Sequence, residues 1–555
     1  MIAQAATLFF DLSIYVAAVI ILVLAIGVVF YLNDYRLSLL GVLTFLFTIE
    51  LIYPVFTHFA VLPFGDDYGQ FGIASYIIQH GHLSILSQPP IVTLGINTYS
   101  QWPGFEFAAS SFSLITGISL IQVGVAFPFA LYALWILGSF ILISRFLTKE
   151  SSYTLVVLAL AGSFTFTEIP LHFKYDFLAL DLLIILVILL LDYLKNSKSP
   201  NIVCMILIGA GLVIIHSYTA FVWLVTLFLV TIAVFLGSIH QFSRLHAYLG
   251  VKRNCGRLGP LSLLIFSATL AWWVFIGFAV WVAEANPILS PGTLFRITFA
   301  FANPQGFFDP YLSAATIPWI LSLLHLRNYA FLALIFAGTI TLILRPRAVS
   351  NKEEYLVLLI ILLEIFLGTI FPVLGNNGRI STLLSVVVAI PVLSPFIFLR
   401  NTRLGRFFAI GVTVFFMFTI SLGYWGNSYA PTYLYTPGVS SASFGEHPVF
   451  YGAASGFLES SETNSCVFTN EAYVTSLMFP IEDWYNLHLV GTEPIGPDCI
   501  VIVYNQLDTF NTSYITEGGT SYHGFSYIAL GRQLVYNFDS VFSATVPVRI
   551  YISPR

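Results

Sequence analysis

Long apolar stretches separated by short polar segments make up the first three quarters of the chain. Several of these stretches hold 18 or more nearly uncharged residues, which is enough for a helix to cross about 30 Å of hydrocarbon. The pattern therefore predicts a polytopic α-helical membrane protein with about twelve transmembrane helices. The expected spans lie near residues 9–31, 38–57, 120–144, 152–168, 176–194, 202–216, 218–238, 261–283, 328–344, 354–373, 380–399 and 407–424.

The division at 202–238 rests on length, because no obvious loop interrupts this run. A run of 37 residues is too long for a single crossing. We therefore divide it at His216 and Ser217, the polar pair near its middle.

The amino-acid composition also supports a membrane protein. The 555 residues are 58% hydrophobic and 9% charged, whereas a soluble protein carries roughly 25% charged residues. There is no basic tract, so nucleic acid is not an expected partner. The N-terminal segment has no basic region before its apolar run, so we interpret it as a retained helix.

Lysine and arginine predict the orientation, because they concentrate in cytoplasmic loops. With the N-terminus outside, 15 of the 22 basic residues fall in cytoplasmic loops, a strong asymmetry. The expected location is the plasma membrane, with multiple passes and both termini extracytoplasmic.

Three regions then face outward: loops at 58–119 and 284–327, and a tail at 425–555. The segments 69–81, 105–117 and 315–325 are too short to span and are partly apolar, which predicts interfacial helices. Residues 1–424 form the expected transmembrane domain. The tail is a predicted small α/β or α+β domain, with strands at 466–470, 499–505, 525–530 and 546–553 and helices at 449–461 and 471–479.

The tail also contains Cys466 and Cys499. On an oxidising outer face these two residues could form a disulfide. The alternative is two free thiols.

The candidate chemistry centres on Asp66 and Asp67, which follow an apolar stretch in the first outer loop. One carboxylate could act as a general base, or the pair could hold a divalent cation such as Mg²⁺ or Mn²⁺. Asp67 and His82 are the candidate metal ligands. The alternative is a solvated turn. Glu106, in the segment SQWPGFEF, could assist the pair, while Trp102 and Phe105 are expected to be membrane-interface anchors.

Basic residues are scarce outside, and Arg379, Arg327 and Lys174 each lie next to a predicted membrane boundary. They could bind a lipid phosphate, or they could extend to the interface or pair with carboxylates. His216 could hydrogen-bond a phosphate or a sugar hydroxyl, or it could simply end a helix.

Glu50, Asp181 and Glu364 lie inside predicted spans. Carboxylates there face a protein interior or a watery cavity, so they could serve transport or could bond helices together.

This arrangement resembles the GT-C superfamily of membrane glycosyltransferases. The resemblance rests on GDDYGQ and QWPGFEF in the first outer loop, the 284–327 loop with HLRN, and the outer tail. It implies a polyprenyl-phosphate sugar donor, Asp66 or Asp67 as the catalytic or metal-binding acid, and Arg379 as a phosphate ligand. The WWDYG-type motif of oligosaccharyltransferases is absent from the tail, which argues against sequon glycosylation.

The sequence thus predicts an inverting transferase that moves a sugar from polyprenyl (dolichyl) phosphate to an acceptor at the outer membrane face. The expected partners are membrane lipid, the lipid-linked donor and a glycan, lipid or protein acceptor. The alternatives are a lipid or solute transporter or flippase, or a non-catalytic cell-surface assembly protein.

Overall fold

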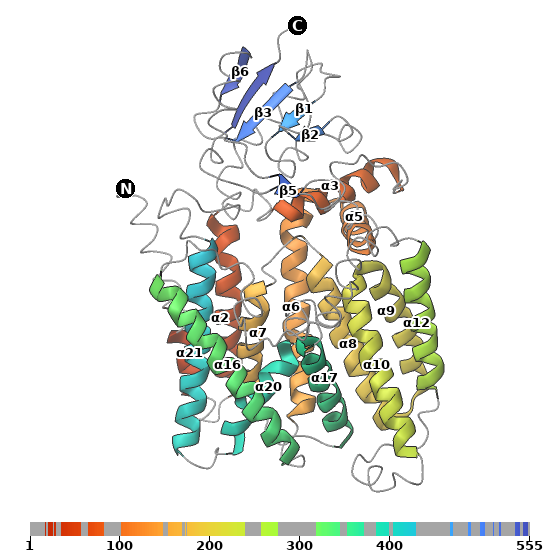
Figure 1. Ribbon diagram of the computed structural model, residues 1–555, viewed down its shortest axis with the longest axis vertical. Coiled ribbons are helices and arrows are strands. Elements are labelled where there is room, and N and C mark those ends of the chain that lie inside the picture. The colour runs from red at the N-terminus through yellow and green to blue at the C-terminus, as the bar shows by residue number, and fades with distance from the viewer. Residues whose placement is uncertain are drawn as a thin grey trace. The chain divides into compact units, whose positions relative to one another are not determined.

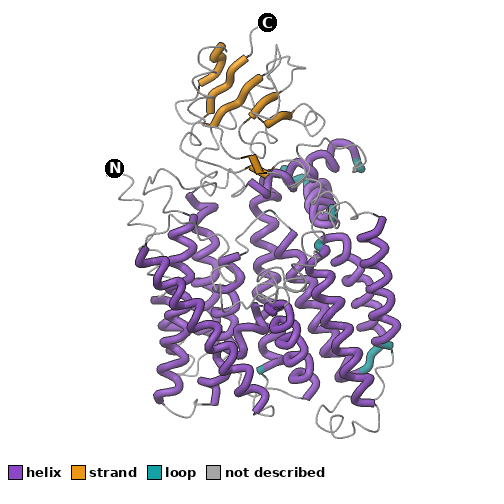
Figure 2. Tube along the Cα trace, in the orientation of Figure 1, coloured by secondary structure: helices purple, strands orange, loops and turns teal. Residues whose placement is uncertain are grey.

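The computed structural model is dominated by helices in the apolar part of the chain and has short strands near the C-terminus (Figures 1 and 2). The residues that it describes are 17, 20–25, 27–28, 35–56, 65–82, 102–147, 154–168, 173, 175–238, 257–275, 318–344, 352–370, 385–398, 403–428, 467–469, 487–489, 500–504, 514–515, 521–522, 539–543 and 548–552.

The helices within these ranges agree closely with the expected spans. They are α2 (Tyr35–Phe56), α3 (Gly65–His80), α5 (Gly104–Thr116), α6 (Leu120–Phe146), α7 (Thr154–Glu168), α8 (Tyr175–Asn196), α9 (Ser199–Ile215), α10 (Ser217–Ser238), α12 (Leu258–Phe275), α16 (Pro318–Leu344), α17 (Lys352–Ile370), α20 (Ser385–Phe398) and α21 (Arg403–Ser428). The expected first span, 9–31, lies largely outside the described residues.

Four of the described helices are long and apolar enough to cross a membrane: Gln122–Phe146, Tyr175–Asn196, Ser217–Leu236 and Leu258–Phe275. Shorter apolar helices accompany them at Arg36–Phe47, Ser199–Ile215, Ala333–Leu344 and Val386–Pro395. The membrane class is thus supported, while the number of crossings stays a prediction.

The chain divides into two compact units. Unit 1 comprises Met1–Ile52, Phe129–Leu171 and Tyr175–Tyr433, and unit 2 comprises Tyr53–Pro128, His172–Lys174 and Leu434–Arg555. The predicted boundary at 424/425 stays a prediction.

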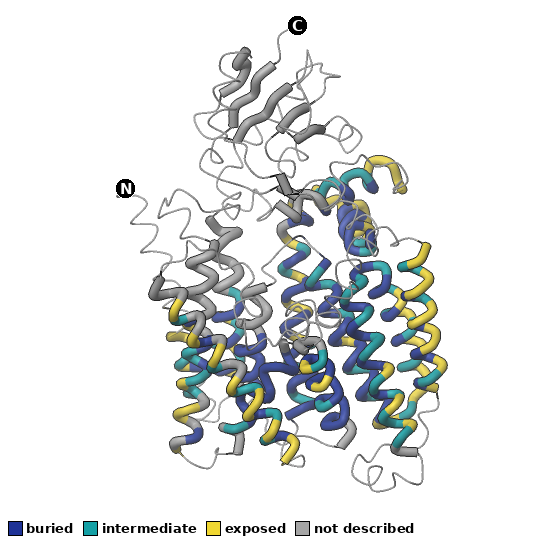
Figure 3. The backbone as a smooth tube through the Cα atoms, viewed as in Figure 1, coloured by how far each residue is buried: buried dark blue, intermediate teal, exposed yellow. Residues whose placement is uncertain are grey.

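Unit 1 is built from packed helices. In one group α16 packs on α20 and α21, and both α20 and α21 pack on α7. In the other group α9 packs on α8, α10 and α12, while α17 packs on α10 and α8 and also contacts α20. Buried residues are concentrated on α8, α17 and α20 (Figure 3).

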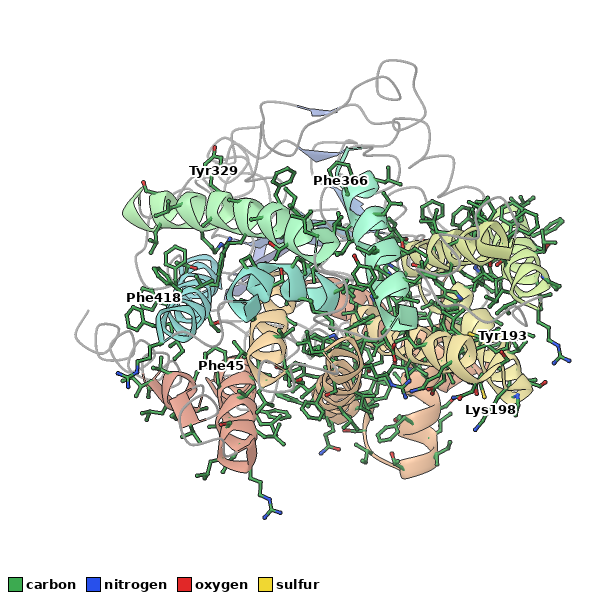
Figure 4. All side chains as sticks on the ribbon, turned by 90° about the horizontal axis from the view of Figure 1, so that it is seen from below. Phe45, Tyr193, Lys198, Tyr329, Phe366 and Phe418 are labelled. Carbon is green, nitrogen blue, oxygen red and sulfur yellow. The ribbon has the colours of Figure 1, made fainter. Side chains whose placement is uncertain are left out.

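Large apolar side chains are also exposed on unit 1. Tyr329 of α16, Phe366 of α17 and Phe418 of α21 are 54%, 52% and 40% exposed, whereas Phe45 and Tyr193 are buried (Figure 4). Exposed apolar side chains on apolar helices are expected where a protein faces lipid instead of water.

The crossing of α16 and α20 requires a glycine. The Ser394 hydroxyl donates a hydrogen bond of 3.0 Å to the Gly338 carbonyl oxygen, so the two backbones lie close together. A Cβ atom on Gly338 would overlap the Pro391 carbonyl group. Glycine is used here because no other residue permits this approach.

Polar contacts join several helix ends of unit 1. Arg145, near the end of α6, forms an ion pair of 2.6 Å with Asp192, near the end of α8. The Arg257 guanidinium, just before α12, donates to the Ser199 hydroxyl at the start of α9. These contacts group the loops that the charge pattern assigns to one side of the membrane. The assignment of that side to the cytoplasm stays a prediction.

The described strands of unit 2 form one mixed sheet of five strands and a separate antiparallel pair, β4 with β5. They are β1 (Val467–Thr469), β2 (Leu487–Leu489), β3 (Ile500–Tyr504), β4 (Tyr514–Ile515), β5 (Ser521–Tyr522), β6 (Asp539–Ser543) and β7 (Val548–Ile552). The sheet order is β2-β1-β3-β7-β6, parallel among the first three strands and antiparallel after them. The strands expected at 466–470, 499–505 and 546–553 correspond to β1, β3 and β7.

Other expectations for the tail lie outside the described residues. They are the helices at 449–461 and 471–479, the strand at 525–530, and both tail cysteines. In the β1–β3 ladder Val467 is paired with Ile500, the residues that directly follow Cys466 and Cys499 in the sequence.

One expected element is wrong. The segment 315–325 was predicted to be a separate interfacial or re-entrant piece, but α16 runs without interruption from Pro318 to Leu344. No glycine or proline follows Pro318 before Gly338, so nothing in the sequence ends a helix there. The polar HLRN group lies within this helix.

Candidate functional site

Asp66 and Asp67 lie in the first turn of α3, which begins at Gly65. The sequence left open a solvated turn, whereas the backbone is helical at both positions. A helix N-terminus favours negative charge because its first N–H groups and the helix dipole point toward it. The backbone thus supports ionised carboxylates here. Their side chains lie outside the described residues.

A second helix of unit 2, α5, packs against α3. Helix α5 ends at Gly117, which adopts a left-handed conformation with φ of 71°. The Gly117 N–H donates a hydrogen bond of 2.9 Å to the Ser113 carbonyl oxygen. The buried Ser110 hydroxyl donates to the Ala74 carbonyl of α3 at 2.9 Å. The expected helices at 69–81 and 105–117 are therefore confirmed as helices, while their position at the membrane interface stays a prediction.

Glu106 lies in the first turn of α5 and is fully buried. Its carboxyl oxygens have no hydrogen-bond partner from another residue in the described part of the chain, and only the backbone N–H of Glu106 itself acts to lower the pKa. Burial raises the pKa of Glu106 well above its ordinary value of 4.5, because the surroundings do not solvate the charged form. Burial therefore favours the neutral form of this carboxyl over the charged form.

The prediction that Trp102 and Phe105 are membrane-interface anchors is wrong. Trp102 and Phe105 are 7% and 0% exposed, so they belong to the interior of unit 2. The Phe105 ring lies 5.0 Å from the Phe173 ring and 5.8 Å from the Phe127 ring, which explains its burial. The exposed apolar residues of α5 are instead Phe107, Phe112, Leu114 and Ile115.

Only one of the three predicted phosphate-binding residues lies among the described residues. Arg379 and Lys174 lie outside the described residues. Arg327 was expected in a loop just before a span, but it lies inside α16 and is 3% exposed. A buried arginine requires hydrogen-bonding or charged neighbours.

His216 lies where the sequence predicted, between α9 and α10. Its backbone is extended, and its N–H bonds the Leu212 carbonyl at 2.9 Å, closing α9. Its ring Nδ1 lies 2.6 Å from the Thr219 hydroxyl, and the ring packs 4.5 Å from the ring of Tyr175. These contacts favour the helix-ending interpretation.

The metal pair Asp67 and His82 is not compatible with α3. Fifteen residues separate the two, and a helix rises about 1.5 Å per residue, so the pair spans roughly 20 Å. One ion cannot bind both residues. Among the described side chains, no group of three or more His, Cys, Asp or Glu residues could hold a metal ion.

The acidic residues inside the predicted spans differ in their hydrogen bonding. The Thr226 hydroxyl of α10 donates to the Glu364 carboxyl of α17 at 2.5 Å, so Glu364 bonds two helices together. Asp181 on α8 is 5% exposed, and its oxygens have no hydrogen-bond partner among the described residues. The side chain of Glu50 lies outside the described residues.

Sequence reasoning missed Gln70. This glutamine of α3 is fully buried, and neither its amide nitrogen nor its amide oxygen has a hydrogen-bond partner in the described residues. Its position between Gly69 and Phe71 in a mostly apolar helix was the available signal, because an amide there is costly to bury.

Comparison with known proteins finds no matching family model and no significant match among curated proteins. Among solved structures, the chain is similar to ArnT from Cupriavidus metallidurans bound to undecaprenyl phosphate. The identity is 11%, the TM-score is 0.47, and the match covers 93% of this chain and 99% of ArnT.

It is also similar to the Archaeoglobus fulgidus oligosaccharyltransferase in its apo form. There the identity is 12%, the TM-score is 0.43, and the match covers 88% of this chain and 66% of the other. TM-scores below 0.5 assign neither activity nor site residues.

Proposed function

We propose that this protein is a membrane glycosyltransferase of GT-C type. It moves a sugar from a polyprenyl-phosphate carrier to an acceptor at the outer face of the membrane. The observation that carries the proposal is the position of Asp66 and Asp67 in the first turn of α3, a helix outside the expected spans that packs on α5. In the sequence the pair follows the expected span 38–57 within the first outer loop, the region where a lipid-linked substrate is expected to arrive.

The proposed reaction is a single displacement with inversion at the anomeric carbon. One aspartate accepts the proton of the acceptor hydroxyl, whose oxygen bonds to the anomeric carbon. The bond from that carbon to the phosphate oxygen breaks, and polyprenyl phosphate leaves with the electron pair. Arg379, Arg327 and Lys174 are the proposed cations that stabilise the leaving phosphate, and His216 is a proposed hydrogen-bonding residue.

A divalent cation is compatible with the adjacent carboxylates of Asp66 and Asp67, because hard cations prefer oxygen ligands. When bound, such an ion would neutralise phosphate oxygens. His82 is excluded from that site by the length of α3.

The transporter alternative depends on the acids inside the spans. Glu364 has a hydroxyl partner on a neighbouring helix, which is the behaviour of a residue that bonds helices together. That contact gives Glu364 a role in helix packing, whereas Asp181, which has no hydrogen-bond partner among the described residues, keeps the transporter as the alternative.

The test is sugar transfer by the purified full-length chain in lipid, with radiolabelled polyprenyl-phosphate sugars and a membrane extract as acceptor source. We expect Asp66→Asn or Asp67→Asn to lower transfer by about 10²- to 10⁴-fold, the usual contribution of a general base. The control is Asp192→Asn, which removes a carboxylate that is paired with Arg145. Unchanged transfer in both variants would remove the pair from catalysis, and no transfer by wild type with several donors would overturn the proposal.

A further inference from the structure

The C-terminal end of α3 carries three aromatic rings that lie close together. The His80 ring stacks on the Tyr76 ring with the ring centres 4.1 Å apart. The His82 ring centre lies 6.3 Å from that of His80 and 6.2 Å from that of Tyr76. Both histidines are exposed, so the cluster presents two neighbouring imidazoles that a ligand can reach.

A tight turn brings these two imidazoles together. Helix α3 ends at His80, and Gly81 follows with φ of 72°, a left-handed conformation that favours glycine. The Gly81 N–H donates a hydrogen bond of 2.8 Å to the Ile77 carbonyl oxygen, which completes the end of the helix. The conformation of Gly81 therefore determines where the His82 side chain begins, one residue further along the chain.

A hydrogen bond orients the His80 ring. Its Nδ1 atom lies 3.1 Å from the Tyr76 carbonyl oxygen. A carbonyl oxygen only accepts hydrogen bonds, so Nδ1 carries the proton, and Nε2 of the neutral ring carries the lone pair. Histidines that bind metals almost always donate their other ring N–H in this way, to a carbonyl oxygen, a carboxylate or water. His80 is thus held in the tautomer that a metal ligand requires.

The separation of the two rings fits one shared metal ion. A Zn–N bond is about 2.0–2.1 Å long, so an ion bound to two imidazoles places their ring centres roughly 5 to 6.5 Å apart, depending on the bond angle. The observed 6.3 Å lies at the wide end of this range. A tetrahedral angle requires the exposed His82 ring to move by only about 1 Å. The carbonyl groups and dipole at a helix C-terminus also favour a positive charge there.

We propose that His80 and His82 form a binding site for a divalent transition-metal ion that prefers nitrogen ligands, such as Zn²⁺ or Cu²⁺. Imidazole suits these ions, whereas Mg²⁺ and Ca²⁺ prefer oxygen. No group of three or more His, Cys, Asp or Glu residues occurs among the described side chains, so we expect water to complete the coordination. The bound ion joins the Gly81 turn to the last turn of α3 and stabilises that end of the helix.

This site is separate from the acidic pair. Asp66 and Asp67 lie in the first turn of α3, whereas His80 ends the helix, and the helix rises about 1.5 Å per residue between them. The metal site therefore does not depend on the transfer reaction proposed above, and it can be tested without any sugar donor.

The test is a metal titration of the purified full-length chain in lipid nanodiscs, with no affinity tag attached. We expect His80→Ala and His82→Ala each to weaken Zn²⁺ binding at this site by about 10- to 100-fold or more, because even the loss of a residue that only orients a ligand has this effect. At one Cu²⁺ per chain, electron paramagnetic resonance should show two imidazole nitrogens in wild type and one fewer in each variant. His488→Ala, in β2, removes a histidine from another part of the chain and is the control.

A matched pair of glycine variants tests the turn without removing a ligand. Gly81 and Gly117 have nearly the same left-handed φ, 72° and 71°, and each has open space where a Cβ would be added. Gly81→Ala should strain the turn that precedes His82 and weaken Zn²⁺ binding by about 3- to 10-fold. Gly117→Ala strains the end of α5 to the same degree and should leave Zn²⁺ binding unchanged.

Zn²⁺ should also slow hydrogen exchange of residues 76–82 in wild type and not in the two histidine variants. Equal Zn²⁺ affinity in wild type and both variants would overturn the site, and an effect of only one histidine would overturn the shared ion. Displacement of Zn²⁺ by excess Mg²⁺ would indicate oxygen ligands and would also overturn it. Asp66→Asn and Asp67→Asn should leave Zn²⁺ binding unchanged, so a failure of this site and a failure of the proposed transferase are observed separately.

Discussion

From the burial of Glu106 we predict how the free energy of unfolding changes with pH. The perturbation is Glu106→Gln, which keeps the shape of the side chain and removes its titration. The group is fully buried, and burial raises its pKa well above 4.5. The other titratable groups on the two packed helices are Asp66, Asp67 and two tyrosines and a histidine of α3, all of which remain in the variant.

The sign of the pH dependence of stability follows from whether the folded or the unfolded chain holds the Glu106 proton. Below pH 4.5 the Glu106 carboxyl is protonated in both the folded and the unfolded chain, and the contribution of its neutral form to stability is complete. Above that pH the unfolded chain releases the proton while the folded chain retains it. Each further pH unit then lowers the free energy of unfolding by about 1.4 kcal/mol, until the pH passes the folded-state pKa.

The assay is thermal unfolding of wild type and Glu106→Gln in the same lipid nanodiscs, between about pH 4.5 and pH 7.5, with Thr116→Ala as control. We expect the variant to gain stability relative to wild type as pH rises, by about 1.4 kcal/mol per unit. Parallel curves for the two proteins would refute the reasoning, because they would mean that Glu106 has the same pKa folded and unfolded. A gain by wild type with rising pH would indicate an ionised carboxylate with a cationic partner.

Two further predictions concern the packing of unit 1 and the tail. Gly338→Ala should destabilise the protein by about 1–3 kcal/mol in thermal unfolding, because its methyl group overlaps the Pro391 carbonyl. Gly411→Ala, whose added methyl meets nothing within 4 Å, is the matched control, and equal stability of the two variants would contradict the close approach. Mass spectrometry of unreduced peptides should find Cys466 linked to Cys499, since each directly precedes a paired strand position of β1 or β3. Maleimide labelling of both thiols in protein kept oxidised would contradict this link.

The helices of unit 1 were predictable because length and hydropathy decide them. The run 202–238 shows how far this reasoning extends. Its division at His216 and Ser217 was argued from bilayer thickness, and α9 does end at Ile215, with His216 extended and α10 beginning at Ser217. A polar pair in the middle of an overlong apolar run is a usable signal because the bilayer limits how long one crossing can be.

The start of α16 was not predictable in the same way. Hydropathy places the boundary where polar residues begin, and HLRN therefore looked like a loop. Helix continuation depends instead on local backbone preference, and leucine, arginine and alanine all favour a helix. The helix thus extends through Arg327 and buries it.

The burial of the aromatic residues at the start of α5 could also not be predicted from the sequence. Trp102 and Phe105 looked like interface anchors because aromatic residues are common at the membrane boundary. The burial of Phe105 depends on Phe127 and Phe173, which are not its neighbours in the sequence. No local pattern distinguishes an aromatic residue packed against such partners from one that faces lipid headgroups.

Glu364 and Glu106 show why the sequence could nominate acidic residues but not assign their roles. Both are buried glutamates on helices, yet Glu364 accepts a hydrogen bond from the Thr226 hydroxyl, while no other described residue bonds the Glu106 carboxyl. The role of a buried carboxyl depends on what faces it, and the facing residue is set by packing between helices. The charged form is expected only where solvent, a cation or several donors surround it. The place of Asp66 and Asp67 in the first turn of α3 favours negative charge, which is the physical reason for proposing the chemistry on them.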